Sequence, residues 1–370
     1  MNKCVIASDS FKGTLSSKEI TELFESAFRE KFPNVLLEKV VLADGGENTL
    51  EVFANAFPNG TIHHLNVCGP NFNNVKAKYF INGDFAVIEL AKASGLSLAN
   101  KKNPLNTTTY GVGELIKDAY LKGIRKFYVA LGGSSTNDGG CGLLSALGIK
   151  FLDKNNNRFI PVGGTLNNIT NIDMANLLVK DAKFTILSDV TNPMFGPNGA
   201  AYIFAKQKGA TNEEIKLLDK NLQYLNELLV QTTNKDISKI PGTGSAGAVA
   251  AGMLALLDSK IVSGIDTILD IINFDEIIKG SDYIFTGEGK FDRQSLNGKL
   301  ISGVLDKANK QNIKVICICG KNALKEKSNN IFYRVIETNT KGLNFYQIKE
   351  KASKLYLEAV KDALCNLSNI

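Results

Sequence analysis

The chain has 370 residues, of which 44% are hydrophobic and 22% are charged, as in ordinary globular proteins. This length exceeds the size at which one hydrophobic core usually stops growing, so two domains are expected. The net charge of +6 suits an anionic small molecule and is too small and too dispersed to indicate a nucleic-acid partner.

Neither the cysteines nor the apolar segments indicate export or membrane insertion. The six cysteines show no CxxC spacing, and the first residues lack the apolar stretch of a signal peptide. The longest apolar run, residues 246–257, is shorter than the roughly 20 residues that cross a bilayer. We therefore expect a cytoplasmic protein with reduced thiols and no membrane partner. The sequence leaves the oligomeric state open, a homodimer included.

The N-terminal residues alternate between strand and helix patterns. KCVIAS at 3–8 is a short apolar run typical of a strand that is buried on both faces. Ser16 and Glu19 have the spacing of a capping box, and the apolar residues after them recur at helical intervals. A second strand is expected at 35–43 and a second helix at 49–57.

The middle of the chain begins with closely spaced strand patterns. Three of them, at 61–69, 75–81 and 85–90, are separated by turn signals, and Asn82-Gly83-Asp84 is a hairpin signature. They predict antiparallel pairing. Two further strand-loop-helix patterns start at 126–131 and 183–188.

The C-terminal part again alternates between strand and helix patterns, as the first residues do. Strands are expected at 282–287, 313–320 and 332–337, with helices near 295–309 and 345–365. Repeated β-α alternation predicts an α/β fold with a mostly parallel sheet. We therefore predict a doubly wound domain formed by residues 1–70 and 281–370. A mixed-sheet α/β domain, residues 71–280, is inserted into it, and the active site is expected in the cleft between the two domains.

Six loops of one chemical style follow the apolar segments. They combine small residues with carboxylates or amides, in SDSFKG (8–13), ADGGEN (43–48), GGSSTNDGG (132–140), SDVTNPMFGPNG (188–199), PGTGSAG (241–247) and TGEGKFD (286–292). In open α/β sheets ligands bind at such strand ends, because helix N-termini and backbone amides meet there. A single glycine loop often only closes a turn, but six together favour an anion-binding site.

Several kinds of chemistry are disfavoured. His63 and His64 are the only histidines, so a zinc site or a Ser-His-Asp triad is not expected, and no GxxxxGK[ST] P-loop occurs. Residues 242–247 match GxGxxG, which supports an alternative, an NAD(P)-dependent oxidoreductase acting on a small hydroxy acid. The preceding residues do not resemble a buried strand, so we interpret this stretch as an anion-binding helix start.

The remaining groups suit phosphoryl transfer. The loops contain seven carboxylates and two lysines near strand ends. The carboxylates are Asp9, Asp44, Glu47, Asp138, Asp189, Glu288 and Asp292, and the lysines are Lys12 and Lys290. Phosphoryl transfer needs the charge of the transferred group to be neutralised by amides, lysine and Mg²⁺, and a carboxylate to accept the hydroxyl proton. Mg²⁺ takes one or two carboxylates together with water and phosphate oxygens.

The ordered motifs resemble those of the bacterial glycerate kinases. The resemblance covers nearly the whole chain and rests on SDSFKGTLSS, LADGGENT, ALGGSSTNDGG, SDVTNPMFGPNGAA, QKGAT, PGTGSAG and TGEGKFDRQSLNGK. It implies phosphorylation of D-glycerate with ATP and Mg²⁺, with 2-phosphoglycerate favoured over 3-phosphoglycerate as the product. It also implies a flavodoxin-like domain built from the two chain ends around a distinct α/β domain.

Individual roles are hypotheses that follow from the loops. Asp189 is the expected general base or Mg²⁺ ligand, Lys12 and Asp138 are further catalytic candidates, and Asp138 is equally well a helix cap. Glu288 and Asp292 are the other metal candidates. The expected substrate-binding residues are Asp9, Ser10, Asp44, Gly45, Gly46, Asn137 and Asn192. The expected nucleotide-binding residues are Gly132, Gly133, Gly242, Gly244, Gly287, Gly289 and Lys290.

Overall fold

In the computed structural model the chain forms two compact units. The terminal unit joins residues 1–43 to residues 265–370, and the middle unit is residues 44–264. The structure describes residues 1–367 apart from 12, 44, 47, 293–294, 296–299 and 366, and residues 368–370 also lie outside the description. Among the described residues, no helix has both the length and the apolar character needed to cross a bilayer.

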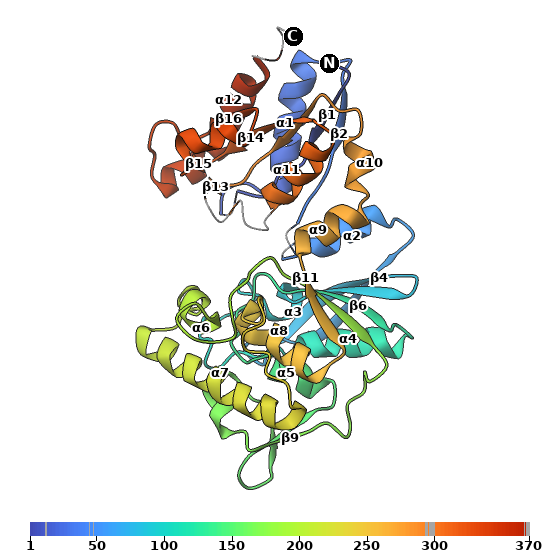
Figure 1. Ribbon diagram of the computed structural model, residues 1–370, viewed down its shortest axis with the longest axis vertical. Coiled ribbons are helices and arrows are strands. Elements are labelled where there is room, and N and C mark those ends of the chain that lie inside the picture. The colour runs from blue at the N-terminus through green and yellow to red at the C-terminus, as the bar shows by residue number, and fades with distance from the viewer. Residues whose placement is uncertain are drawn as a thin grey trace. The chain divides into compact units, whose positions relative to one another are not determined.

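The terminal unit is built around a five-stranded parallel sheet (Figure 1). Its elements are β1 (Lys3–Ile6), α1 (Ser17–Lys31), β2 (Leu36–Lys39), α9 (Gly264–Ile271, whose first residue belongs to the middle unit), α10 (Phe274–Ile278), β12 (Tyr283–Thr286), β13 (Lys290–Phe291), α11 (Leu300–Lys310), β14 (Lys314–Cys319), β15 (Lys321–Asn322), η4 (Lys325–Asn330), β16 (Arg334–Glu337) and α12 (Phe345–Cys365).

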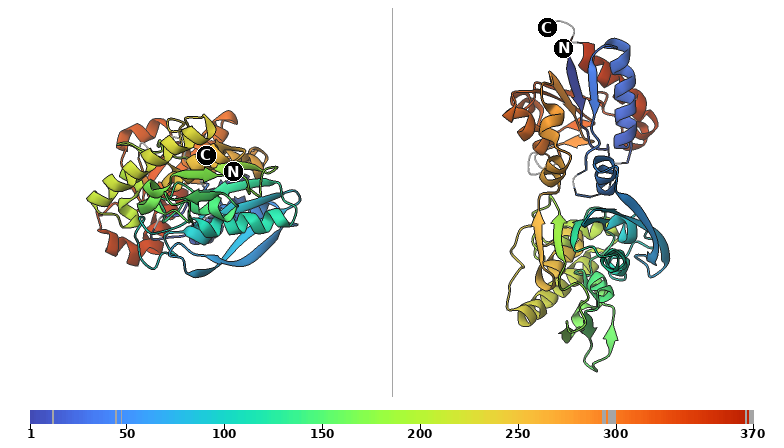
Figure 2. Two further views of the ribbon diagram at one scale, coloured as in Figure 1. Left: turned by 90° about the horizontal axis from the view of Figure 1, so that it is seen from below. Right: turned by 90° about the vertical axis from the view of Figure 1, so that its right-hand side faces the viewer.

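The strand order confirms the predicted flavodoxin-like topology. The strands lie in the order β2-β1-β12-β14-β16, which is the 2-1-3-4-5 order of a flavodoxin-like sheet. Helices α1 and α12 pack together on one face, where Phe24 and Tyr356 join Phe285 in the core. Helix α11 packs against β12 and β14 from the other face (Figure 2). Both faces of the sheet are therefore covered, which explains the continuous apolar runs of its strands.

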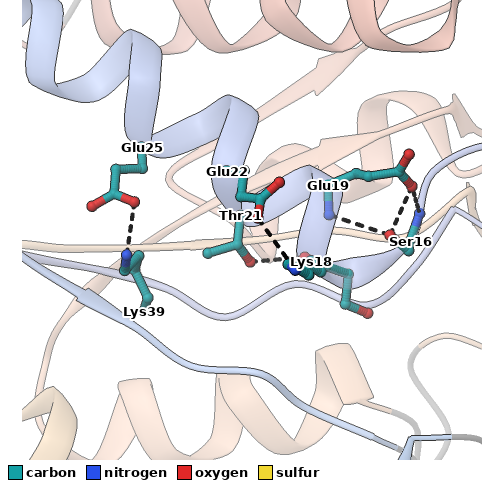
Figure 3. A network of polar contacts seen from close by, with 8 residues as sticks. Ser16, Lys18, Glu19, Thr21, Glu22, Glu25 and Lys39 are labelled. Carbon is teal, nitrogen blue, oxygen red and sulfur yellow. Dashed lines mark hydrogen bonds and ion pairs between the residues drawn. The ribbon is translucent and has the colours of Figure 1, made fainter.

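Helix α1 begins with the predicted capping box (Figure 3). The Glu19 amide donates to Ser16 Oγ at 3.2 Å, and the Ser16 amide donates to Glu19 Oε2 at 2.8 Å. On the same helix Glu25 pairs with Lys39 of β2 at 2.7 Å. The cap satisfies backbone donors that a helix start leaves without a partner, so the chain turns into α1 directly after the loop that follows β1.

The middle unit contains a six-stranded mixed sheet and a small three-stranded sheet. Its elements are α2 (Thr49–Ala56), β3 (Thr61–Cys68), β4 (Asn74–Asn82), β5 (Phe85–Glu89), α3 (Ala91–Ser94), α4 (Tyr110–Leu121), β6 (Lys126–Ala130), α5 (Cys141–Ala146), β7 (Lys150–Leu152), β8 (Arg158–Phe159), η1 (Gly163–Asn168), β9 (Asn171–Asp173), β10 (Lys183–Leu187), α6 (Ala200–Phe204), η2 (Lys206–Lys208), α7 (Asn212–Thr233), α8 (Ser245–Leu256) and β11 (Ser259–Val262).

The six-stranded sheet has the order β11-β10-β6-β5-β4-β3. The predicted hairpins are confirmed, since β3 pairs with β4 and β4 with β5 in antiparallel register, whereas β5, β6, β10 and β11 are parallel. Phe53 of α2 packs on Phe85 and Tyr128 on one face. Val129, the next residue of β6, joins the core formed with α4, α5 and α8 on the other face.

The boundaries of the two units differ from the expected ones at residues 70 and 280. The chain leaves the terminal unit after residue 43 and returns to it at residue 265. The reason is strand pairing, because β3 forms a hairpin with β4 and so belongs to the middle sheet. Helix α2 also belongs to the middle unit, and most of α9 and all of α10 to the terminal unit.

Candidate functional site

Asp189 lies at the carboxyl end of β10, in the middle unit. Its Oδ1 accepts hydrogen bonds from the Ser263 hydroxyl at 2.9 Å and from the Gly264 amide at 2.8 Å. Ser263 follows β11, and Gly264 begins α9. Because β10 and β11 are parallel neighbours, their carboxyl ends meet, and the two donors orient the Asp189 carboxylate at this edge of the sheet.

Three predicted glycines approach one another at the same edge. A Cβ on Gly132 would lie 2.4 Å from Gly46 Cα, and one on Gly45 would lie 3.1 Å from the carbonyl carbon of Leu187. The Gly132 amide donates to the Gly45 carbonyl at 3.4 Å. The structure therefore brings the ADGGEN and GGSSTNDGG loops together beside the end of β10. Asp44 and Glu47 of the first loop lie outside the described residues.

We expect Gly132→Ala to damage this contact. The new methyl group must displace the Gly46 backbone, and forcing extra volume into a packed site costs about 1–3 kcal/mol of stability. Urea unfolding and steady-state kinetics should both show a loss. Ser97→Ala is the control, because Ser97 is exposed in the same unit and the substitution adds no volume. Wild-type turnover in Gly132→Ala would contradict close packing of these two loops.

The loop that starts with Ser188 packs against the PGTGSAG loop. The Gly244 amide donates to the Asn192 carbonyl at 2.9 Å, and the Ser188 and Ser245 hydroxyls lie 2.6 Å apart. The Asn192 side-chain amide donates to the Asn198 carbonyl at 2.8 Å. A Cβ on Gly242 would lie 3.1 Å from the Val190 carbonyl oxygen. Predicted residues Asn192, Gly242 and Gly244 are thus neighbours.

The start of α8 does not match a dinucleotide-binding turn. Turns rather than a strand precede it, and residues 246–248 adopt left-handed backbone conformations inside the assigned helix. A GxGxxG sequence indicates a dinucleotide site only between a buried strand and a regular helix. The geometry removes the support that this motif lent to the oxidoreductase alternative.

Asp138 has the contacts of a helix cap. Its carboxylate accepts from the Thr109 amide and hydroxyl, both at 2.8 Å, and from the Gly140 and Gly142 amides at the start of α5. Burial raises the pKa of the carboxyl group, and these hydrogen bonds oppose that shift. Asn137, the preceding residue, is also buried, but neither atom of its side-chain amide has a hydrogen-bond partner among the described residues.

A second group of predicted residues lies in the terminal unit, at the carboxyl ends of β1 and β12. The Asp9 carboxylate accepts from the Ser10 amide at 2.6 Å and from its hydroxyl at 3.3 Å, and the Asp9 amide donates to the Gly287 carbonyl at 3.0 Å. These adjacent strands form the switch point of a flavodoxin-like sheet, where ligands usually bind. Lys12 lies outside the described residues.

The loop after β12 continues this second group. The carbonyl groups of Glu288 and Gly289 accept from the Gly320 and Lys321 amides at 3.1 and 3.2 Å. Lys290 forms an ion pair with Asp292 at 3.0 Å, in which the lysine side chain is 61% exposed. Lys290 therefore keeps contact with solvent at the end of the parallel sheet.

The predicted residues thus form two groups, one in each unit. Among the described residues, no group of three or more His, Cys, Asp and Glu side chains could hold a metal ion. Mg²⁺ does not need such a group, because it takes one or two carboxylates and completes its shell with water and phosphate oxygens. Gly133 has φ +75°, and its carbonyl accepts from the Leu96 amide, so it serves a turn of the loop after β6.

Glu89 and Lys208 are buried charged residues that sequence reasoning missed. Glu89 ends β5 and is fully buried, where it accepts from the Leu50 amide of α2 at 3.3 Å and pairs with Lys92 at 3.2 Å. Burial raises the pKa of its carboxyl group. It supports the helix that follows the ADGGEN loop. The sequence pattern that could have revealed it is a single glutamate, Glu89, within the otherwise apolar stretch FAVIEL.

Comparison with known proteins assigns a family to this arrangement. A glycerate kinase from Bacillus cereus (strain ATCC 10987 / NRS 248) is 40% identical over 94% of both chains. A glycerate 2-kinase from Escherichia coli (strain K12) is 42% identical over 86% of this chain and 85% of the relative. The crystal structure of a protein assigned as glycerate kinase 2 from Salmonella typhimurium LT2 has a TM-score of 0.80 at 33% identity and covers 99% of this chain and 98% of that one. Because the model of the glycerate kinase family also matches residues 4–368, which span both units, the chain is a kinase that belongs to the glycerate kinase family.

Proposed function

We propose that this kinase transfers the γ-phosphoryl group of ATP to a hydroxyl group of D-glycerate, with Mg²⁺, and that the product is 2-phosphoglycerate. The observation that carries the proposal is Asp189, whose carboxylate is oriented by Ser263 and Gly264 beside the backbones of Gly45 and Gly132. A fixed carboxylate next to closely packed glycines suits a general base beside a transferring anion.

The proposed roles divide between the two groups of residues. Asp189 accepts the proton of the attacking hydroxyl group or binds Mg²⁺, and the amides of Gly45 and Gly46 face the developing negative charge. The Gly132 amide holds the Gly45 carbonyl and so positions this loop. In the terminal unit, Glu288 and Asp292 supply oxygen donors of the kind that Mg²⁺ prefers, and Lys290 supplies a cation for a phosphate. When bound, Mg²⁺ neutralises charge on the transferred group.

The other substrate contacts remain proposals on the same basis. Asp9 and Ser10 are placed at the switch point, and Asn137 and Asn192 in loops of the middle unit. We propose that Asp138 acts as a positioning residue that caps α5. Its four protein donors support this role better than metal binding. We also propose a cytoplasmic location, supported by the thiols of Cys4, Cys68, Cys141, Cys317 and Cys319, which form no disulfide.

A coupled assay of ADP release tests the reaction. With D-glycerate, ATP and Mg²⁺ the protein should release ADP, and other small hydroxy acids should give less. Phosphorus NMR of the product should show phosphate on the 2-hydroxyl group. Reduction of NAD⁺ or NADP⁺ by D-glycerate, without ADP release, would replace the proposal with the oxidoreductase.

A further inference from the structure

Lys208 is a buried lysine that no proposed step uses. It belongs to the QKGAT motif and ends η2, where its exposure is 2%, while Lys206 of the same short helix is exposed. Its Nζ donates to Ser134 Oγ at 2.8 Å and to the Thr136 carbonyl oxygen at 2.7 Å. Lys208 therefore reaches the loop that follows β6, the same loop that holds Gly132.

No carboxylate in the described part of the chain contacts this ammonium group. Both acceptors are neutral, and no carboxylate of the described residues forms an ion pair with Lys208. Asp138 attracts it from a distance and opposes the effect of burial, but burial dominates and lowers the pKa of Lys208 to about 7. The Asp138 carboxylate is already held by Thr109 and the start of α5. Buried charges in proteins are normally paired or neutralised, and a bound anion would pair the ammonium form of Lys208.

Polar atoms with no partner lie in the same loop. The Thr136 hydroxyl and both side-chain amide atoms of Asn137 are buried without a hydrogen bond among the described residues. A Cβ on Gly247 would lie 2.1 Å from the Thr136 carbonyl oxygen and 2.6 Å from Asn137 Cα, so the start of α8 packs directly against them. Buried polar atoms nearly always have a partner, and three such atoms in two successive residues indicate a missing ligand.

We propose that Lys208, Thr136 and Asn137 form a subsite for an oxyanion group of a substrate, with Lys208 supplying the positive charge. This proposal rests on the proposed function. The oxyanion is either the carboxylate of the hydroxy acid or a phosphate of the nucleotide, because both accept hydrogen bonds from ammonium, hydroxyl and amide groups. Since the three side chains are buried, the loop must open for the anion to reach them.

Steady-state kinetics of Lys208→Met and Lys206→Met test the subsite. Methionine retains the apolar length of lysine without its charge, and Lys206→Met is the matched control on the exposed side of η2. We expect Lys208→Met to raise the KM of one substrate at least tenfold, the typical effect of losing a charge-assisted hydrogen bond. A rise in the KM for D-glycerate identifies the bound oxyanion as its carboxylate, and a rise in the KM for ATP identifies it as a phosphate.

A second variant separates binding from structure. Thr136→Val removes a hydroxyl group that has no partner among the described residues, so the fold should keep its stability while the same KM rises. Unchanged KM values in both folded variants, or a fall in kcat alone, would overturn the subsite. If the wild-type protein does not phosphorylate D-glycerate, the proposed function fails separately. Stabilisation against heat by D-glycerate, inorganic phosphate or ADP, lost in Lys208→Met, would still support the subsite, and its absence would reject it.

Discussion

Asp189→Asn should lower turnover by about 10²- to 10⁴-fold, the usual contribution of a general base. Asparagine retains a side-chain carbonyl oxygen, which can still accept from Ser263 and Gly264. Its amide group cannot take up the hydroxyl proton and is a poor Mg²⁺ ligand. The orientation of the side chain should therefore survive while the chemistry is lost. Turnover measured at saturating D-glycerate and ATP, beside thermal unfolding, checks both parts.

Asp258→Asn is the matched control for Asp189→Asn. Asp258 is exposed and precedes β11, so it lies at the amino end of the strand whose carboxyl end holds the Asp189 partners. The control should keep wild-type turnover. If Asp189→Asn also keeps it, Asp189 is neither base nor metal ligand. Ser263→Ala should give a smaller loss than Asp189→Asn, because it removes the Ser263 hydrogen bond and leaves both the carboxylate and its bond from the Gly264 amide in place.

Elements with strong local patterns could be predicted from the sequence. The apolar stripe between residues 345 and 365 predicts a helix that is observed at Phe345–Cys365, with Ala352, Ala359 and Val360 buried. The hairpin signature at Asn82-Gly83-Asp84 correctly placed the turn between β4 and β5, where Gly83 has φ +55°. In both cases the decisive information lies within a few neighbouring residues.

The features that escaped prediction depend on distant partners. Lys208 is buried because Ser134 and Thr136, more than 70 residues earlier in the chain, accept its hydrogen bonds. Whether Asp138 is a cap or a ligand depends on Thr109, which no local pattern relates to it. The boundary of the middle unit depends on the pairing of β3 with β4 rather than on a change in composition. Such contacts arise only when the chain packs.

Lys208 should also make stability depend on pH in the neutral and alkaline range. Its pKa is about 7 in the folded protein, against an ordinary value of 10.5. Between these values the unfolded chain binds a proton that the folded protein does not, so the free energy of unfolding rises with pH. The lowered pKa of Lys208 reduces the free energy of unfolding by about 4 kcal/mol at pH 7 and by about 2 kcal/mol at pH 9. It disappears above the pKa of the unfolded chain.

Urea unfolding of the wild-type protein and Lys208→Met at pH 7 and pH 9 measures this difference. The stability of Lys208→Met relative to the wild-type protein should fall by about 2 kcal/mol between the two pH values. For Lys206→Met it should not change, and a pH-independent difference for Lys208→Met would mean that Lys208 titrates normally. An anion bound at Lys208 favours the protonated ammonium. The KM of the substrate that supplies this anion should therefore rise above pH 7 in the wild-type protein and stay level in Lys208→Met.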